Sequence, residues 1–344
     1  MGYMKKYKCP SCLTTSSVIR HAKRGSSIRY LCRSCRKYFS ISTIHCNTKQ
    51  LLSDHLDGIS FRKLASKYGI SKSHAFDLCY EELKKLPNNN QFTHKYCDRF
   101  SHIFVVDGKY LTVKGYKYGY CLLWGVDYFR HDIPVFTLAP SENYQSWAKY
   151  FSYYRIFAHH PSLLVCDDNV NIKMAARNTF PTVKIQTCYN HFKENIRREL
   201  HIRSDTTYKP FMRRIESILK GKLSDETLNR WLFALYRDYH NDPVCLSVLT
   251  NIEKYKSELL AYRGIPQAPF TSNLMESFNS HLEARLFSLK HFHSVAHARL
   301  WLNGYILKRR CTKFTSCSRK FAFLNGKTGI QMTQKQGTVL PSFF

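Results

Sequence analysis

The sequence has no long apolar run, and acidic residues are scarce in it. No stretch approaches the ~18 apolar residues that a membrane span requires, and the basic start from Met1 to Cys9 has no apolar segment after its charges. These absences predict a protein that has no membrane partner and stays in the cytoplasm, associated with the nucleoid if it is bacterial. We also find no internal repeat and no low-complexity tract.

The scarcity of acids leaves a strong positive charge. The 344 residues include 53 Lys and Arg against 24 Asp and Glu, for a formal net charge of +29, and the excess is scattered along the whole chain. Such an excess favours a polyanionic partner, which predicts binding to double-stranded DNA. The alternative is a merely solvated positive surface. At 44% hydrophobic residues, the length predicts more than one domain and at least one sizeable core.

The first four of the 13 cysteines form two pairs, Cys9-x₂-Cys12 and Cys32-x₂-Cys35, with nineteen residues between the pairs. Four thiolates at this spacing predict a tetrahedral Zn²⁺ site on two knuckles, in a zinc ribbon over residues 1–45. Disulfides are the alternative, which a reducing compartment disfavours. We expect the other cysteines to be small buried apolar residues. Basic side chains expected to face phosphates lie after the second knuckle, at Arg33, Arg36 and Lys37, and on the intervening loops, at Arg20, His21, Lys23, Arg24 and Arg29.

Residues 46–87 have helical periodicity that is interrupted twice by the same tripeptide. Gly58-Ile59-Ser60 and Gly69-Ile70-Ser71 each supply a turn residue, an apolar anchor and a Ser N-cap. This pattern resembles a helix-turn-helix DNA-binding domain, and an unrelated helical hairpin is the alternative. We expect the recognition helix to begin with three residues that reach base edges: Lys72, Ser73 and His74.

Residues 100–204 have the pattern of an α/β domain. Three antiparallel strands are expected first, then a helix, and then strand and helix in alternation. This order is that of a ribonuclease-H-like fold, in which the first and fourth strands are neighbours. The expected strands are Ile103–Val106, Tyr118–Val126, Ile133–Leu138, Ser162–Cys166 and Val183–Thr187, and the expected helices are Asn143–Phe157, Ile172–Asn178 and one from Asn190.

Later segments break the strand pattern. Residues 205–264 have helical spacing throughout and predict an all-helical insertion, in which Trp231 is expected to be a core residue and contact with DNA is the alternative. Residues 265–310 are expected to be the last part of the core, with a helix over Thr271–Lys290. Residues 311–344 are interpreted as a basic tail, and the neighbouring Arg310 is expected to belong to the same basic region.

Three acids are candidates for a catalytic metal site. Asp107 ends an apolar run and is followed by Gly108, which permits the close approach of a backbone or phosphate. Asp167 and Asp168 follow another apolar run, and we expect one to bind a metal while the other caps the next helix. Glu276 lies on the predicted helix that begins at Thr271. Cleavage of a phosphodiester and strand transfer need two Mg²⁺ or Mn²⁺ ions, for which such acids are suitable ligands.

Cys188-Tyr189-Asn190-His191 follows the last predicted strand. Its Cys and His could belong to a second zinc site, but no matching pair lies nearby in the sequence. His191 is more simply explained as a residue beside the acids that orients a ligand or a phosphate, or as a core histidine.

With these acids and Cys188-x₂-His191 in this order, the chain resembles the mutator-type transposases of bacterial insertion sequences and their eukaryotic Mutator-like relatives. Residues 165–191 are similar to the family's second-acid block, although Cys166, Asp168 and Tyr189 stand where the family usually has Ser, Gly and Trp. The run Asn273-x-x-Glu276-x-x-Asn279 matches its third block.

The resemblance implies a DDE transposase that binds terminal inverted repeats and cuts and joins DNA with Mg²⁺. It assigns the catalytic acids as Asp107, Asp167 and Glu276, with support from His191 and Asn279, and synapsis of two ends implies a homodimer or a higher oligomer. The N-terminal zinc ribbon is more familiar from other insertion-sequence families. The alternatives are a non-catalytic DNA-binding regulator descended from a transposase, and a ribonuclease-H-like nuclease that does not join strands.

Overall fold

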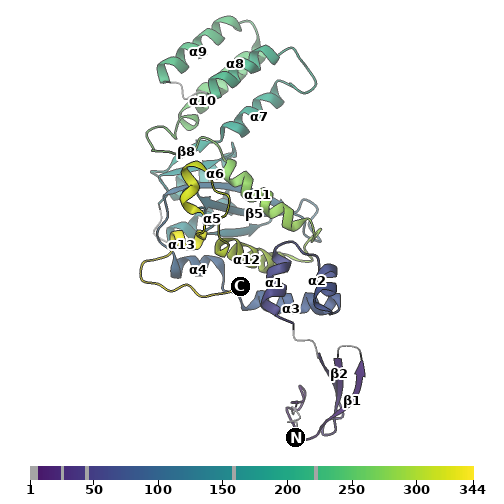
Figure 1. Ribbon diagram of the computed structural model, residues 1–344. Coiled ribbons are helices and arrows are strands. Elements are labelled where there is room, and N and C mark those ends of the chain that lie inside the picture. The colour runs from purple at the N-terminus through teal and green to yellow at the C-terminus, as the bar shows by residue number, and fades with distance from the viewer. Residues whose placement is uncertain (1–6, 25–26, 43–45, 157–159, 221–223) are drawn as a thin grey trace. The chain divides into compact units, whose positions relative to one another are not determined.

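The computed structural model describes residues 7–24, 27–42, 46–156, 160–220 and 224–344 (Figure 1). The chain divides into two compact units, one of residues 1–86 with 343–344 and one of residues 87–342. The first six residues, the side chain of Arg24 and the predicted helix end at Phe157 lie outside the described residues. None of the described helices is long and apolar enough to cross a membrane.

The first unit begins with a three-stranded antiparallel sheet of β1 (Val18–Arg24), β2 (Ser27–Cys32) and β3 (Tyr38–Ser42), in that order. The residues between the cysteine pairs therefore form strands and not the loops that we expected, and Arg20, His21 and Lys23 lie on β1. Tyr30 and Phe39 stack between β2 and β3, with ring centroids 5.7 Å apart. This small sheet has little apolar core of its own.

Three helices follow in the same unit: α1 (Thr48–Leu56), α2 (Phe61–Tyr68) and α3 (Lys72–Lys85). Both predicted serine caps are confirmed, because the side chains of Ser60 and Ser71 accept hydrogen bonds from the backbone at the third residue of α2 and α3. Gly69 ends α2 at a positive φ of 64°. The buried residues of the three helices are Leu51, Leu52, Leu56, Leu64, Ala75, Cys79 and Leu83.

The second unit is built on a mixed five-stranded sheet (Figure 1). Its strands lie in the order β6 (Phe136–Ala139), β5 (Tyr120–Asp127), β4 (Ile103–Leu111), β7 (Leu163–Cys166), β8 (Lys184–Thr187). β4, β5 and β6 are antiparallel, whereas β7 and β8 run parallel to β4. The first and fourth strands of the sheet are therefore neighbours, as expected from the sequence.

β4 is much longer than its parallel neighbour, which matters for the site. The β4–β7 ladder pairs Ile103 to Val105 with Leu163 to Val165, and β7 ends at Cys166. The β4–β5 ladder continues to Leu111. Beyond Val105, β4 is thus paired with β5 while its other edge has left the β7 ladder.

Helices cover the two faces of this sheet. α5 (Tyr144–Ile156) packs on the face toward which Gly125 points, since a β-carbon added there would lie 2.8 Å from Oη of Tyr150. α11 (Asn273–Leu286) packs on the opposite face, where Phe278 meets Trp124. The other helices of the core are α4 (Asn89–Tyr96), α6 (Val170–Thr179), α7 (Tyr189–Glu199) and α12 (Val295–Cys311).

The predicted insertion is helical, with α8 (Lys209–Lys220), α9 (Asp225–Asp238) and α10 (Pro243–Leu259). These helices share one buried apolar cluster with α7, and α10 also contacts β8. Trp231 on α9 is 43% exposed, so the expectation that it is a core residue is wrong. Its neighbours Leu228, Leu232 and Leu235 form the buried stripe of the helix, and Trp231 lies at the edge of this stripe.

The last segment has structure of its own, with a 3₁₀ helix η1 (Arg319–Leu324) and a short helix α13 (Gly329–Thr333). Arg310, expected to belong to the basic region, is instead fully buried. Its guanidinium donates to both carboxylate oxygens of Asp132, at 2.7 and 2.8 Å, and to Asn89 and Thr93. Thr333 of α13 donates to the same Asp132, which ties this segment to the core.

Candidate functional site

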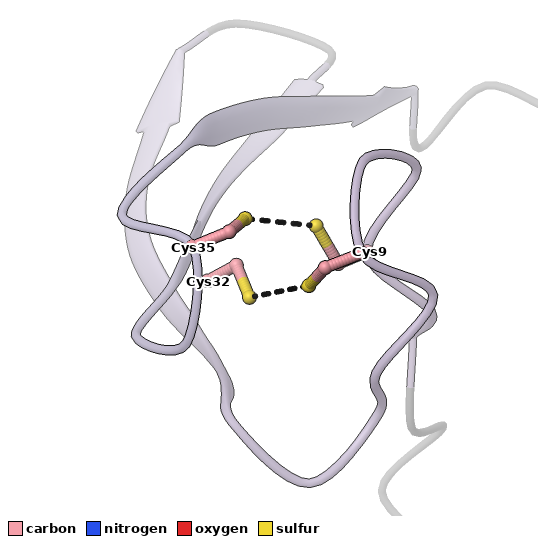
Figure 2. A group of neighbouring side chains, drawn as sticks. Cys9, Cys32 and Cys35 are labelled. Atoms are coloured by element: carbon pink, nitrogen blue, oxygen red, sulfur yellow. Dashed lines mark hydrogen bonds between the residues drawn. The ribbon is translucent and has the colours of Figure 1, made fainter.

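Four cysteines of the first unit come together, with the sulfur atoms of Cys9, Cys12, Cys32 and Cys35 within 4.8 Å of one another. Sγ of Cys9 lies 3.6 Å from Sγ of Cys35, and Sγ of Cys12 lies 3.5 Å from Sγ of Cys32, as Figure 2 shows for these thiols. A tetrahedral zinc ion with Zn–S bonds of ~2.3 Å requires sulfur separations of about 3.8 Å. The cluster therefore fits a zinc ion with little adjustment.

The two knuckles have the same backbone geometry. Leu13 and Arg36, each directly after the second cysteine of its pair, both have a positive φ, of 61° and 56°. Backbone hydrogen bonding from Cys12 lowers the pKa of Cys9 to about 6. Backbone hydrogen bonding from Cys35 likewise lowers the pKa of Cys32. Since zinc binds the thiolate form, these turns favour the metal-binding state of both cysteines.

The residues predicted to contact DNA lie in the first unit. Lys72, Ser73 and His74 form the first turn of α3, where Lys72 and Ser73 are exposed. The residues predicted to face phosphates at the second knuckle, Arg33, Arg36 and Lys37, are also exposed. The side chains at the start of α3 and those beside the second knuckle are therefore accessible to solvent.

In the second unit, Asp107 lies in the middle of β4, opposite Trp124 of β5. Its Oδ1 accepts the backbone N–H of Gly108 at 2.9 Å, and its Oδ2 accepts from Nδ2 of Asn279 at 2.6 Å. Burial, followed by the charge of Asp167, raises the pKa of Asp107 to about 6. Asp107 is half-buried, and a carboxyl whose ionised form is disfavoured in this way gains from a nearby cation.

Asn279, on α11, is held in turn by Trp124, whose indole N–H donates to its Oδ1 at 3.2 Å. With its oxygen occupied in this way, the amide must present its N–H₂ group to Asp107. The sequence placed Asn279 near the acids only through the third block of the family. The contact shows that it orients the carboxylate of Asp107.

Asp167 follows β7 directly, beside the edge of β4 where the ladder ends. Its Oδ1 accepts the backbone N–H of Asn169 at 3.2 Å, and burial raises the pKa of its carboxyl. Asn169 is the N-cap of α6, with its side chain accepting from the N–H of Asn171 at 2.9 Å. The expectation that Asp167 or Asp168 caps this helix is therefore wrong, because the cap lies one residue further on.

Asp168 instead forms an ion pair with Lys173 of α6, at 2.5 Å. The Lys173 ammonium, whose side chain is 4% exposed, also pairs with Glu258 of α10 at 2.6 Å. Glu258 accepts from Arg177 and Thr187 as well. Asp168 thus belongs to a network that links the insertion to the turn of Asp167.

Glu276 lies in the first turn of α11 and is exposed. One carboxylate oxygen of Glu276, Sγ of Cys188 and a ring nitrogen of His191 all lie within 4.8 Å of one another. Asp107 and Asp167 are not members of this group. Asp107 and Asp167 lie close enough for the charge of Asp167 to raise the pKa of Asp107. Glu276 instead lies with Cys188 and His191.

Cys188 and His191 are strongly coupled. Cys188 Sγ accepts from the backbone N–H and the hydroxyl of Ser272, at 3.2 and 3.1 Å. Burial raises the pKa of Cys188, but hydrogen bonds with His191 and Ser272 outweigh it and lower the pKa. The hydrogen bond with Cys188 raises the pKa of His191 to about 9. The negative charges of Asp107 and Asp167 also raise the pKa of His191. His191 therefore interacts electrostatically with both aspartates and lies in the same group as Glu276.

A fourth acid, Glu142, was missed from the sequence. It precedes Asn143, whose side chain accepts the N–H of Ser146 at the start of α5. Burial and the charges of Asp167 and Asp107 raise the pKa of Glu142 to about 7. The available signal was its position after the third strand of the sheet, near the strand that carries Asp107.

Comparisons with known proteins identify the family of the chain. The profile of the family described as Transposase, Mutator family matches residues 85–303. The chain therefore belongs to the Mutator family of transposases. A search of curated proteins finds no match.

Among solved structures, the chain is similar to a chain of the cryo-EM structure of a simian T-cell lymphotropic virus intasome in complex with PP2A regulatory subunit B56 gamma. The identity is 16%, the match covers 65% of this chain and 77% of that chain, and the TM-score is 0.23. A similarity at this level carries no argument about fold or function.

Proposed function

We propose that this protein is a DDE transposase with a ribonuclease-H-like core, which cuts DNA at the ends of its element and joins the freed ends to a target. The observation that carries the proposal is a pair of half-buried aspartates, Asp107 on β4 and Asp167 directly after the neighbouring β7, in a chain of the Mutator family. Burial raises the pKa of both carboxyls, and the charge of Asp167 raises that of Asp107 further. Such an arrangement is costly without a cation and is typical of functional sites.

In this proposal Asp107, Asp167 and Glu276 bind divalent cations, Mg²⁺ or Mn²⁺. Two such ions, when bound, activate the attacking oxygen and stabilise the leaving 3′-oxygen. Asn279 orients Asp107 through its amide, and Trp124 fixes the amide. His191 lies beside all three acids as a cation that can contact a phosphate. The separation of Glu276 from the aspartates requires α11 or its side chain to adjust when DNA and metal bind.

The first unit is proposed to bind the ends of the element. Zn²⁺ held by Cys9, Cys12, Cys32 and Cys35 would fold the ribbon, whose Arg33, Arg36 and Lys37 contact phosphates. The first turn of α3 would read base edges in the major groove. Because strand transfer joins two element ends to one target, the active form is proposed to be a dimer or a higher oligomer.

The test uses the full chain and a labelled duplex that carries the element's own ends, with Mg²⁺. The proposal expects cleavage and strand transfer by the wild type, and loss of both with retained DNA binding for Asp107→Asn, Asp167→Asn and Glu276→Gln. The exposed Glu283→Gln on the same helix is the matched control and keeps activity. Tight binding without cleavage in any divalent metal would favour a regulator, and cleavage without joining would favour a nuclease.

A further inference from the structure

The start of α11 is hydrogen-bonded to the start of α7. Sγ of Cys188, the N-cap residue of α7, accepts from both the backbone N–H and the hydroxyl of Ser272, at 3.2 and 3.1 Å. Ser272 is the N-cap residue of α11. Close by, Nδ2 of Asn190 donates to Oδ1 of Asn273 at 2.7 Å. These hydrogen bonds hold two segments that are far apart in the chain against each other.

Three side chains of different chemistry meet where the two helices begin. One ligand atom from each of Cys188, His191 and Glu276 lies within 4.8 Å of the other two. A tetrahedral zinc ion, with a Zn–S bond of ~2.3 Å and Zn–N and Zn–O bonds of ~2.1 Å, requires separations of about 3.4–3.6 Å. Glu276 is exposed, so its side chain can rotate to close the remaining distance. The three residues, which we call the Cys188 group, therefore approach the geometry of a metal site.

The ligand types of the Cys188 group favour one kind of ion. Thiolate, imidazole and carboxylate are the side-chain ligands that zinc uses in proteins. Mg²⁺ prefers carboxylate and water oxygens in an octahedral arrangement. A site that supplies one sulfur, one nitrogen and one carboxylate oxygen therefore suits a zinc ion better than a magnesium ion.

Ser272 supports the Cys188 group as an outer partner. Its two hydrogen bonds to Sγ of Cys188 stabilise the thiolate, which is the form that binds a metal. Its Oγ also lies 3.4 Å from Nδ1 of His191. Metal ligands are commonly oriented by such partners. Three protein ligands leave a fourth position for water, as in zinc sites that exchange a ligand.

We propose that Cys188, His191 and Glu276 bind a zinc ion in the DNA-free protein, and that this ion keeps Glu276 apart from Asp107 and Asp167. Release of the ion makes Glu276 available to the aspartates and lets His191 contact a phosphate. The ion is thus a reversible inhibitor and is distinct from the zinc of the ribbon. Its inhibitory role rests on the proposed function, whereas its binding does not.

The experiment counts zinc in the DNA-free full chain by inductively coupled plasma mass spectrometry, during competition with a chelator. We expect the wild type to hold one zinc ion in the ribbon and a second in the Cys188 group. Glu276→Gln should weaken binding of the second ion by about 10-fold or more, the least that loss of an outer partner costs. Cys188→Ser should abolish it. The exposed Glu283→Gln on α11 is the matched control and should keep both ions.

Cobalt tests whether Cys188 is a ligand. When the ribbon is filled with zinc, Co²⁺ added to the second site should produce the absorption band of a cobalt–thiolate bond. This band should be missing in Cys188→Ser and present in Cys46→Ser, whose cysteine lies outside both groups. Glu276→Gln changes an exposed side chain, so it tests the site even if Cys188→Ser does not fold.

A wild type that holds only the ribbon zinc and gives no cobalt–thiolate band would overturn the inference. A second ion that Glu276→Gln binds with wild-type affinity would also overturn it, because Glu276 would then not be a ligand. Zinc added to the Mg²⁺ cleavage reaction should slow cleavage, and an unchanged rate would refute the inhibitory role. If the wild type cleaves DNA but binds only the ribbon zinc, this inference alone fails. If it binds the second ion but never cleaves, the proposed function fails.

Discussion

The cysteine cluster of the first unit and the acidic site of the second unit differ in how completely their ligands are assembled. The four cysteine sulfurs lie within 4.8 Å of one another, at nearly the separation that a tetrahedral ion requires. The acids are spread over β4, the end of β7, the start of α5 and α11, and Glu276 groups with Cys188 and His191 instead of with the aspartates. The difference follows from the elements, because the cysteines belong to two knuckles of one small sheet whereas the acids come from separate strands and helices.

The comparison also separates two roles for a metal. The ribbon has little apolar core, so a metal there is expected to supply most of its stability. The second unit has a large buried core around its sheet, so we expect its fold not to depend on a cation. Metal removal should therefore unfold the ribbon, and should leave the acidic site folded but electrostatically strained.

The largest expected effect is on the ribbon. Cys32→Ser removes a buried thiolate ligand, and we expect loss of the bound zinc and of the structure of β1 to β3, since such sites contribute ~10 kcal/mol or more. Zinc content and the NMR signals of the ribbon measure this. The control is Cys46→Ser, a cysteine of the same unit outside the cluster. Zinc retained at full stoichiometry by Cys32→Ser would contradict the assignment.

The next effect concerns the core that supports the acidic site. Arg310→Met leaves Asp132 buried without its ion-pair partner, for an expected loss of about 3–5 kcal/mol in the free energy of unfolding. Denaturant titration measures the loss. The matched variant Arg237→Met breaks an exposed pair with Asp238 and should cost less than ~1 kcal/mol. Similar losses in the two variants would show that the buried pair does not stabilise the core.

A smaller effect tests the strain at the aspartates. Because the pKa of Asp107 is raised in the folded state, to about 6, its ionisation opposes folding as the pH rises above the unfolded value near 4. Asp107→Asn should therefore be more stable than the wild type at pH 7 without divalent cations, by on the order of 2 kcal/mol. The two should converge below about pH 4, where both side chains are neutral. Melting curves with EDTA at the two pH values measure this, and a difference that does not depend on pH would refute the electrostatic cause.

The smallest effect distinguishes the two adjacent aspartates. Asp168→Asn removes the charge that pairs with Lys173. This ion pair helps to hold the turn that carries Asp167. We expect about a 10-fold lower cleavage rate, equivalent to ~1.4 kcal/mol, with Mg²⁺ dependence retained. Asp167→Asn should abolish cleavage. Steady-state rates of both variants decide the assignment, which is reversed if Asp168→Asn is the inactive one.

The sequence predicted the four-cysteine cluster and the order of the elements well, because both depend on local signals. The Cys-x₂-Cys spacings, the Gly-Ile-Ser turns and the alternation of strands and helices are all contained in short segments. The position of Asp107 beside the end of β7 also followed from the expected strand order. Trp231 was mispredicted because the buried stripe of α9 passes through its leucines.

The acidic site was less predictable because its contacts are long-range. Nothing near Gly108 in the sequence indicates that the carboxyl of Glu142 fills the space beside it. The burial of Arg310 required knowledge of Asp132, far away in the chain. The grouping of Glu276 with Cys188 and His191 joins residues of α11 and of the start of α7, which are far apart in the chain. The sequence near Cys188 and His191 shows no matching pair of metal ligands.

The most direct test of the proposed function is metal-dependent cleavage of a duplex that carries the element's own ends. We predict that the full chain cuts and joins this DNA with Mg²⁺, and that Asp107→Asn binds the same DNA with wild-type affinity but yields no cut product. Cleavage by Asp107→Asn at the wild-type rate would contradict the assignment of this aspartate to the reaction.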